Sequence, residues 1–205
     1  MYIPAKFLLD DDAAWRVVVD AGAGYLVVAT PSGLASVFVP VIVSDDRTTI
    51  TSHLAKANPW WKAVQPGDDV LGLFLTASAY VTPSYYPSRF ENPGVVPTWN
   101  YVAAEVRGTL TLHEEPTWKL EQVSALTSHF EAGRDPKWRV DEAPSHYIDT
   151  QLKAIVGIEI KVTSIEAKAK LSQNRASIDH DTVRDQFANG TLGEQIVAQR
   201  MFDDD

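Results

Sequence analysis

The sequence contains no cysteine, so disulfide bonds, thiolate nucleophiles and cysteine-ligated zinc or iron–sulfur centres are excluded. Positive charge is also scarce, because 18 lysines and arginines stand against 27 aspartates and glutamates and leave a formal net charge of −9. Binding to nucleic acid through its phosphates needs clustered cations, so this charge does not support DNA contact. No apolar run reaches the roughly 18 residues of a membrane span, and the first residues lack the apolar core of a signal peptide. We therefore expect a cytoplasmic protein with no membrane partner.

Apolar residues, in contrast, are plentiful enough for a folded core. Hydrophobic residues make up 45% and charged residues 22% of the 205 residues, which is typical of a globular protein and unlike a disordered one. This length suits one sizeable domain with a small appendage. We predict a main domain over residues 1–175 and a helical or partly disordered tail over residues 176–205.

Strand patterns recur along the chain and are separated by turns rich in proline, glycine and aspartate. The predicted strands are residues 24–30, 34–43, 48–54, 70–81, 99–113 and 156–165. The first three suggest a meander of consecutive antiparallel strands. Helical spacing predicts helices over residues 10–21, 56–64, 116–131 and about 144–155, the last two inserted between strands. The fold class is therefore mainly β with peripheral helices (α+β), a small closed or nearly closed antiparallel barrel.

Signature motifs of several enzyme classes are missing. The chain has no Gly-x-Ser-x-Gly elbow, Walker loop or Gly-x-Gly-x-x-Gly, which argues against hydrolases and nucleotide triphosphatases. The five histidines never adopt a metal-ligand spacing, so no metal site is predicted. A single axial histidine binds haem without any motif, and haem therefore stays open as an alternative cofactor. No segment indicates a helix-turn-helix, and no catalytic residue is assigned.

One candidate site lies where a predicted strand ends, in residues 51–61. Its polar members are Ser52, His53, Lys56 and Asn58. A strand-to-helix junction of this kind suits a phosphate, because a helix N-terminus offers backbone N–H donors and Lys56 offers a positive charge. The alternative is a capped helix with a solvated lysine.

Two further clusters combine aromatic and polar residues. Residues 80–89 form a proline-stiffened loop that either walls a planar ligand or simply covers the end of the barrel. Residues 96–101 and 170–175 carry amides and hydroxyls that suit hydrogen bonds to the polar edge of a heterocycle. They also offer an indole for stacking, and a lysine or an arginine near an anionic group. The candidate residues of this pair are Thr98, Trp99, Asn100, Lys170, Ser172 and Gln173.

At these clusters the sequence resembles the PaiB-type family of FMN-binding transcriptional regulators. The resemblance rests on motifs such as His-Leu-Ala-Lys-Ala-Asn-Pro-Trp at residues 53–60 and Lys-Leu-Ser-Gln-Asn at residues 170–174. The matching segments follow the family order over about residues 1–175 and are residues 1–4, 53–60, 79–88, 96–101, 154–160 and 170–174.

The resemblance implies a six- to seven-stranded antiparallel split barrel related to pyridoxamine-phosphate oxidases. It also implies a homodimer with FMN at its interface and negative regulation of sporulation and degradative-enzyme genes. By position, residues 53–58 with Lys56 would hold the phosphate, while residues 98–101 and 170–173 would lie near the flavin. The six tryptophans and seven tyrosines agree with a dimer, because aromatic residues favour interfaces.

Three functions follow as hypotheses. The first is a flavin-dependent oxidoreductase or redox sensor, in which the cofactor does the chemistry. The second is a haem-binding or haem-degrading split barrel, which shares the fold and differs in ligand. The third is a DNA-binding repressor without catalysis, against which the net charge stands.

Overall fold

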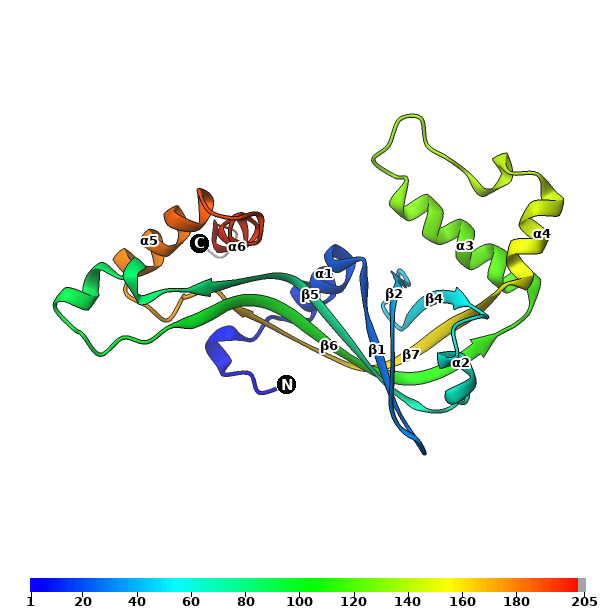
Figure 1. Ribbon diagram of the computed structural model, residues 1–205, viewed down its shortest axis with the longest axis horizontal. Helices are drawn as coiled ribbons and strands as arrows, with labels where there is room; N and C mark the ends of the chain where they lie inside the picture. The colour runs from blue at the N-terminus through cyan, green and yellow to red at the C-terminus, as the bar shows by residue number, and fades with distance from the viewer. Residues whose placement is uncertain (203–205) are drawn as a thin grey trace. The chain divides into compact units, whose positions relative to one another are not determined.

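The computed structural model describes residues 1–202, and the end of the predicted tail, residues 203–205, lies outside the described residues. The strands are β1 (Ala23–Thr30), β2 (Gly33–Pro40), β3 (Ile42–Val43), β4 (Thr49–Ala55), β5 (Asp69–Val81), β6 (Thr98–His113) and β7 (Ile155–Lys170) (Figure 1). The α-helices are α1 (Asp11–Ala21), α2 (Trp60–Ala63), α3 (Pro116–Phe130), α4 (Ser145–Lys153), α5 (Ser177–Ala188) and α6 (Leu192–Phe202). The short 3-10 helices are η1 (Ala5–Phe7), η2 (Pro83–Tyr85), η3 (Pro87–Phe90) and η4 (Val140–Glu142). No helix in the described part of the chain is long and apolar enough to cross a membrane.

The seven strands form one sheet in the order β2-β1-β5-β6-β7-β4-β3, which confirms the predicted class of a mainly β fold with peripheral helices. The predicted meander is wrong, because β1 and β2 form a hairpin while β3 and β4 lie at the opposite edge of the sheet. Pro40 ends β2, since it lacks the N–H that would extend the ladder. The chain then crosses over, and β4 pairs antiparallel with β7. The Ser52 hydroxyl donates to the Pro40 carbonyl at 2.6 Å, so β4 also contacts the end of β2.

Three strands are much longer than the others. β5 has 13 residues, and β6 and β7 have 16 each. Side chains in the middle of β6 alternate between buried and partly exposed, as expected of a strand with one face against the core. The predicted end of the last strand at residue 165 is wrong, because β7 continues to Lys170. This extension brings Lys170 into the sheet.

The chain divides into two compact units. Unit 1 comprises Met1–Val17, Leu75–Ala104 and Glu166–Asp205, and unit 2 comprises Val18–Phe74 and Glu105–Ile165. In unit 1, α5 and α6 lie over one side of the strands and the N-terminal segment lies on the other side (Figure 1). Phe187 and Met201 bury their side chains completely there, so residues 177–202 of the predicted tail are packed helices.

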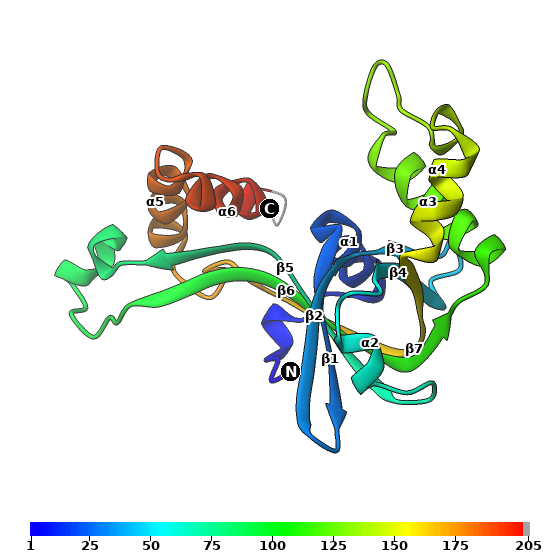
Figure 2. The ribbon, with the colours of Figure 1, turned by 45° about the vertical axis from the view of Figure 1, so that its right-hand side comes forward.

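Unit 2 holds the hairpin, β3, β4 and the inserted helices α3 and α4, which lie side by side (Figure 2). Its core includes the fully buried Leu26, Val28, Ile50 and Ile158. A buried lysine joins the two helices, because Lys119 Nζ donates to the carbonyls of Leu152 at 2.5 Å and Ile155 at 3.3 Å. These bonds satisfy a carbonyl in the last turn of α4 and the carbonyl of Ile155, where β7 begins. Burial lowers the pKa of Lys119.

Candidate functional site

Three of the candidate residues meet in unit 1. Lys170, at the end of β7, donates from Nζ to the Thr98 hydroxyl at 2.6 Å and to the Trp99 carbonyl at 2.7 Å. Both partners are at the start of β6, as its first two residues, so the two strands place a lysine beside an exposed indole. Burial lowers the pKa of Lys170, and the positive charges of Lys168 and Arg175 lower it further.

Asn100 and Ser172 also meet, but both are buried. The Ser172 hydroxyl donates to Asn100 Oδ1 at 3.0 Å, and Asn100 Nδ2 lies 3.8 Å from the sulfur of Met201 on α6. Ser172 adopts a φ of 69°, a left-handed conformation that needs support from its surroundings. The Gln173 side chain supplies part of this support, accepting from the Leu171 amide at 2.7 Å and donating to a nearby carbonyl. These three residues therefore hold the turn after β7 in place.

The candidate residues on β4 and the following turn lie in unit 2 and each has a partner. Ser52 is buried and bonded to β2 as described above. His53 Nδ1 lies 2.8 Å from Gln122 Oε1 on α3. Lys56 forms an ion pair with Glu114 at 2.6 Å, and this contact lowers the pKa of Glu114.

The predicted helix N-terminus at this site is wrong. The helix expected over residues 56–64 is reduced to the four residues of α2. Asn58 Oδ1 accepts from the Trp60 amide at 3.0 Å, where this short helix begins. The amides of Lys56 and Asn58 are already bonded to the carbonyls of Ala154 and Ala55. A phosphate would therefore have to rely on the Lys56 side chain and compete there with Glu114.

The proline-rich loop is mainly structural. Tyr86 is fully buried, with the Arg175 guanidinium 4.5 Å from its ring centroid. Ser88 donates from its amide at 3.0 Å and from its hydroxyl at 2.6 Å to the buried carboxylate of Asp179 on α5. These contacts support the interpretation of residues 82–89 as a rigid cover, whereas Tyr80 before them is half exposed.

Sequence reasoning missed several residues of these clusters. Gln122, the partner of His53, lies 69 positions away, and no local pattern links the two. The spacing of Lys168 and Lys170 gives a weak indication that both belong to one site, because residues two positions apart lie on the same face of a strand. The sequence pattern ends the predicted strand at residue 165, before both lysines.

The residues of unit 1 fit an anionic, planar group. Within the described residues Lys170 contacts a hydroxyl and a carbonyl but no carboxylate. The adjacent Trp99 is 54% exposed as a residue, and its indole is offered here for stacking. In unit 2 the charge of Lys56 is balanced by Glu114. An isoalloxazine ring suits the exposed indole of unit 1, and a phosphate suits the lysine side chains of either unit taken by itself.

Comparison with known proteins gives the same picture. Residues 1–164 match the family described as "Putative FMN-binding domain". The chain is 34% identical over 192 residues to the protease synthase and sporulation protein PAI 2 of Bacillus subtilis (strain 168), covering 92% of this chain and 90% of that protein.

Solved structures share the fold at low sequence identity. The FAD and heme binding protein from Mycobacterium smegmatis matches with a TM-score of 0.61 and 15% identity, over 91% of this chain and 82% of that one. The flavocytochrome Anf3 from Azotobacter vinelandii matches with a TM-score of 0.57 and 11% identity, over 78% of this chain and 67% of that one. The chain therefore belongs to the FMN-binding domain family, and its fold is that of the flavin-binding split barrels.

Proposed function

We propose that this protein binds FMN as a homodimer and acts as a flavin-dependent redox sensor or oxidoreductase of the PaiB-like regulator group. The observation that carries the proposal is the meeting of Lys170, Thr98 and Trp99 in unit 1, in a chain whose family is described as FMN-binding. The two solved neighbours are described as a FAD and heme binding protein and a flavocytochrome, which supports a flavin as the cofactor class.

The protein's own part would be to bind and orient the cofactor, while bound FMN would supply the redox chemistry. Lys170 would place a positive charge beside the ring, and its bonds to Thr98 and the Trp99 carbonyl fix the position of that charge. A second candidate for the phosphate is Lys56 in unit 2, which would exchange Glu114 for phosphate oxygens. A phosphate competes well with one carboxylate, because it carries more charge and more acceptor oxygens.

The dimer is supported by an exposed apolar row on the sheet of unit 2. Tyr25 on β1 lies opposite Phe38 on β2 and opposite Leu73 on β5. All three side chains are exposed, and the rings of Tyr25 and Phe38 are 5.1 Å apart. Exposed apolar rows of this kind are typical of protein interfaces.

The dimer is tested by sedimentation velocity at micromolar concentration. Phe38→Asp should convert the wild-type dimer into a folded monomer. Phe90→Asp is the matched control, because Phe90 is also highly exposed and lies in unit 1. A monomeric wild type, or a Phe38→Asp variant that still sediments as a dimer, would refute this part of the proposal.

The cofactor is tested by the absorption spectrum of the purified protein and by titration with FMN. We expect a flavin band near ~450 nm, as oxidised flavin gives, and weaker FMN binding in Lys170→Gln. A parallel titration with haemin tests the haem alternative. A Soret band with no flavin band would show that the cofactor is haem and not FMN. A colourless protein that binds neither FMN nor haemin would refute the proposal.

A further inference from the structure

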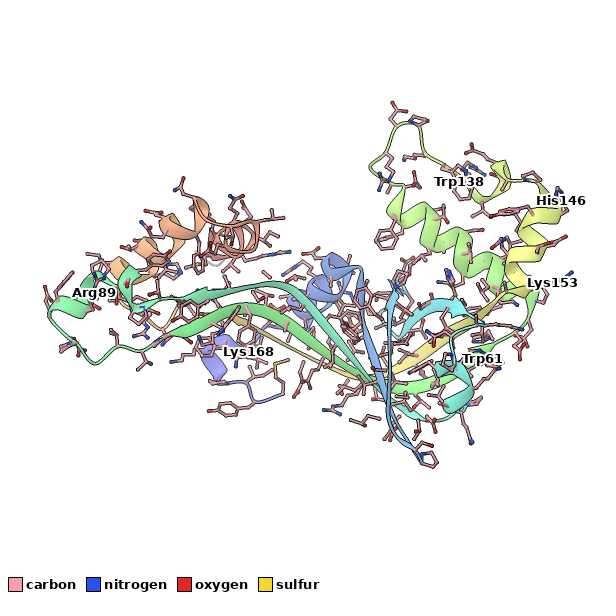
Figure 3. All side chains as sticks on the ribbon, in the orientation of Figure 1. Trp61, Arg89, Trp138, His146, Lys153 and Lys168 are labelled. Atoms are coloured by element: carbon pink, nitrogen blue, oxygen red, sulfur yellow. The ribbon has the colours of Figure 1, made fainter. Side chains whose placement is uncertain are left out.

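A group of lysines and aromatic rings gathers in unit 1 beyond the residues considered so far. We name it the lysine–aromatic surface, and its members are Lys6, Tyr80, Trp99, Tyr101, Lys168 and Lys170. Lys168 Nζ lies 5.2 Å from the centroid of Tyr101 and 5.7 Å from that of Phe7. Figure 3 shows Lys168 beside the N-terminal segment, on the side of the strands away from α5 and α6.

Positive charge on this surface is not balanced by carboxylates. In the part of the chain that the structure describes, Lys6, Lys168 and Lys170 form no ion pair. Glu166 precedes Lys168 by two positions on β7, but its carboxylate lies 3.0 Å from the amino group of Met1. An excess of three positive charges therefore collects in a chain whose net charge is −9.

The burial of Lys168 strengthens the case for an anionic ligand, because this residue is only 7% exposed. Its Nζ has one hydrogen bond, to the Tyr2 carbonyl at a long 3.4 Å. An ammonium group withdrawn from water without a counter-ion costs free energy. The neighbouring rings offset part of this cost through cation–π contact, and an anionic ligand would offset more.

The aromatic members leave ring surface open to solvent. Trp99 is 54% exposed and Tyr80 is 48% exposed, with their ring centroids 6.2 Å apart in an edge-to-face arrangement. Lys170 is bonded to the Trp99 carbonyl, so a cation stands next to the open indole. Stacking on such a ring combined with a nearby cation is a common way to hold a planar anion.

We infer that the lysine–aromatic surface binds an organic anion that has a planar aromatic ring and a phosphate or carboxylate group. The ring stacks on Trp99, and the anionic group is attracted by Lys170, Lys168 and Lys6. FMN itself has this chemistry, in which case the inference rests on the proposed function and adds Lys6 and Lys168 to the site. A second reactant that binds next to the flavin is the other ligand with a planar ring and an anionic group.

The test measures three probes by equilibrium dialysis at low and high salt: FMN, riboflavin, which lacks the phosphate, and nicotinamide mononucleotide, which lacks the flavin. Lys6→Gln and Lys170→Gln should each weaken binding about fivefold or more at low salt, and less at high salt because exposed charges are screened. Lys161→Gln is the matched control, an exposed lysine of β7 in unit 2. Lys6 is exposed and has no hydrogen bond to lose in the described structure, so its variant should fold normally.

The pattern across probes identifies the occupant. Weaker FMN binding with unchanged riboflavin binding places the FMN phosphate here. Equal weakening of both shows that the lysines do not act on an anionic group, and it refutes the inference. Weaker binding of the mononucleotide alone identifies a second reactant. If all three probes bind both variants as they bind Lys161→Gln, the inference is wrong, even where FMN binding stands. If flavins do not bind but lysine-dependent binding of the mononucleotide persists, the proposed function fails and the inference holds.

Discussion

Replacing Gly157 by alanine would test how α3 is held against β7. A Cβ at this position would lie 2.1 Å from Cζ3 and 2.6 Å from Cε3 of Trp118, and 3.1 Å from Cβ of His113. The Trp118 ring already stacks on His113, with centroids 4.0 Å apart and an interplanar angle of 5°. The indole therefore has no room to shift locally and must leave its place.

The expected cost follows from three contributions. Overpacking costs about 1–3 kcal/mol, and the lost stacking costs about 0.5–1.5 kcal/mol. The smaller entropy of the unfolded alanine chain returns about 0.4–1 kcal/mol. We expect Gly157→Ala to lower the free energy of unfolding by a net ~0.5–4 kcal/mol.

The substitution should also disturb the candidate site in unit 2. Trp118 and Gln122 lie one turn apart on α3, and Gln122 contacts His53, whose β4 position pairs with Gly157. Displacing the indole should therefore loosen the contact between Gln122 and His53.

Urea unfolding followed by circular dichroism measures the effect. Gly133→Ala is the control, because no atom lies within 4 Å of its added Cβ and its φ is not positive. The decisive comparison adds Gly157→Ala to Trp118→Ala, where the clash is already gone and the extra cost should vanish. If Gly157→Ala costs as much in that background as in the wild type, the clash with Trp118 is not its cause.

Three further predictions test other contacts. Glu114→Gln removes the partner of Lys56 and should tighten FMN binding about two- to fivefold at low salt, as measured by fluorescence titration; unchanged affinity would place the phosphate elsewhere. Tyr86→Phe removes a buried hydroxyl that has no hydrogen-bond partner in the described structure, and should leave the stability unchanged or raise it by up to about 1 kcal/mol. Burial raises the pKa of Tyr86 above its ordinary value of 10.0. As the pH rises from 10.0 to the folded-state pKa, the unfolded chain loses this proton more readily than the folded protein, and the wild type loses stability. Tyr86→Phe has no such proton, so its unfolding curves should lose less stability over this pH range. Met201→Ala empties a fully buried position next to Asn100 and should cost about 2–5 kcal/mol; a thermal unfolding midpoint equal to that of the wild type would mean that α6 is not packed.

The strands were predictable wherever apolar residues alternate or run together. β5 and β6 match their predicted ranges to within one residue, since β-branched and apolar residues dominate both. The end of β7 was missed because residues 166–170 alternate alanine with charged residues, a pattern that does not favour a strand by itself. Pairing with neighbouring strands overrides that local preference, and sequence alone does not show the neighbours.

The candidate site was predictable only in part for a similar reason. The contact between Thr98 and Lys170 agrees with the family resemblance, which implies that residues 98–101 and 170–173 both lie near the flavin. The burial of Asn100 beneath Met201 depends on a contact between residues 101 positions apart, and nothing in either segment signals it. A polar residue in a binding motif can stabilise the local turn of the chain, as Asn100 does here, and need not contact a ligand.

Net charge and local charge point in opposite directions in this protein. The chain as a whole carries −9, but exposed charges separated by more than about 8 Å are largely screened at physiological salt. An anion that has reached unit 1 therefore responds mainly to Lys6, Lys168 and Lys170, which have no carboxylate partner in the described structure. An anion at Lys56 meets a charge that Glu114 has already balanced. Anion affinity should therefore depend more strongly on salt at the lysines of unit 1 than at Lys56.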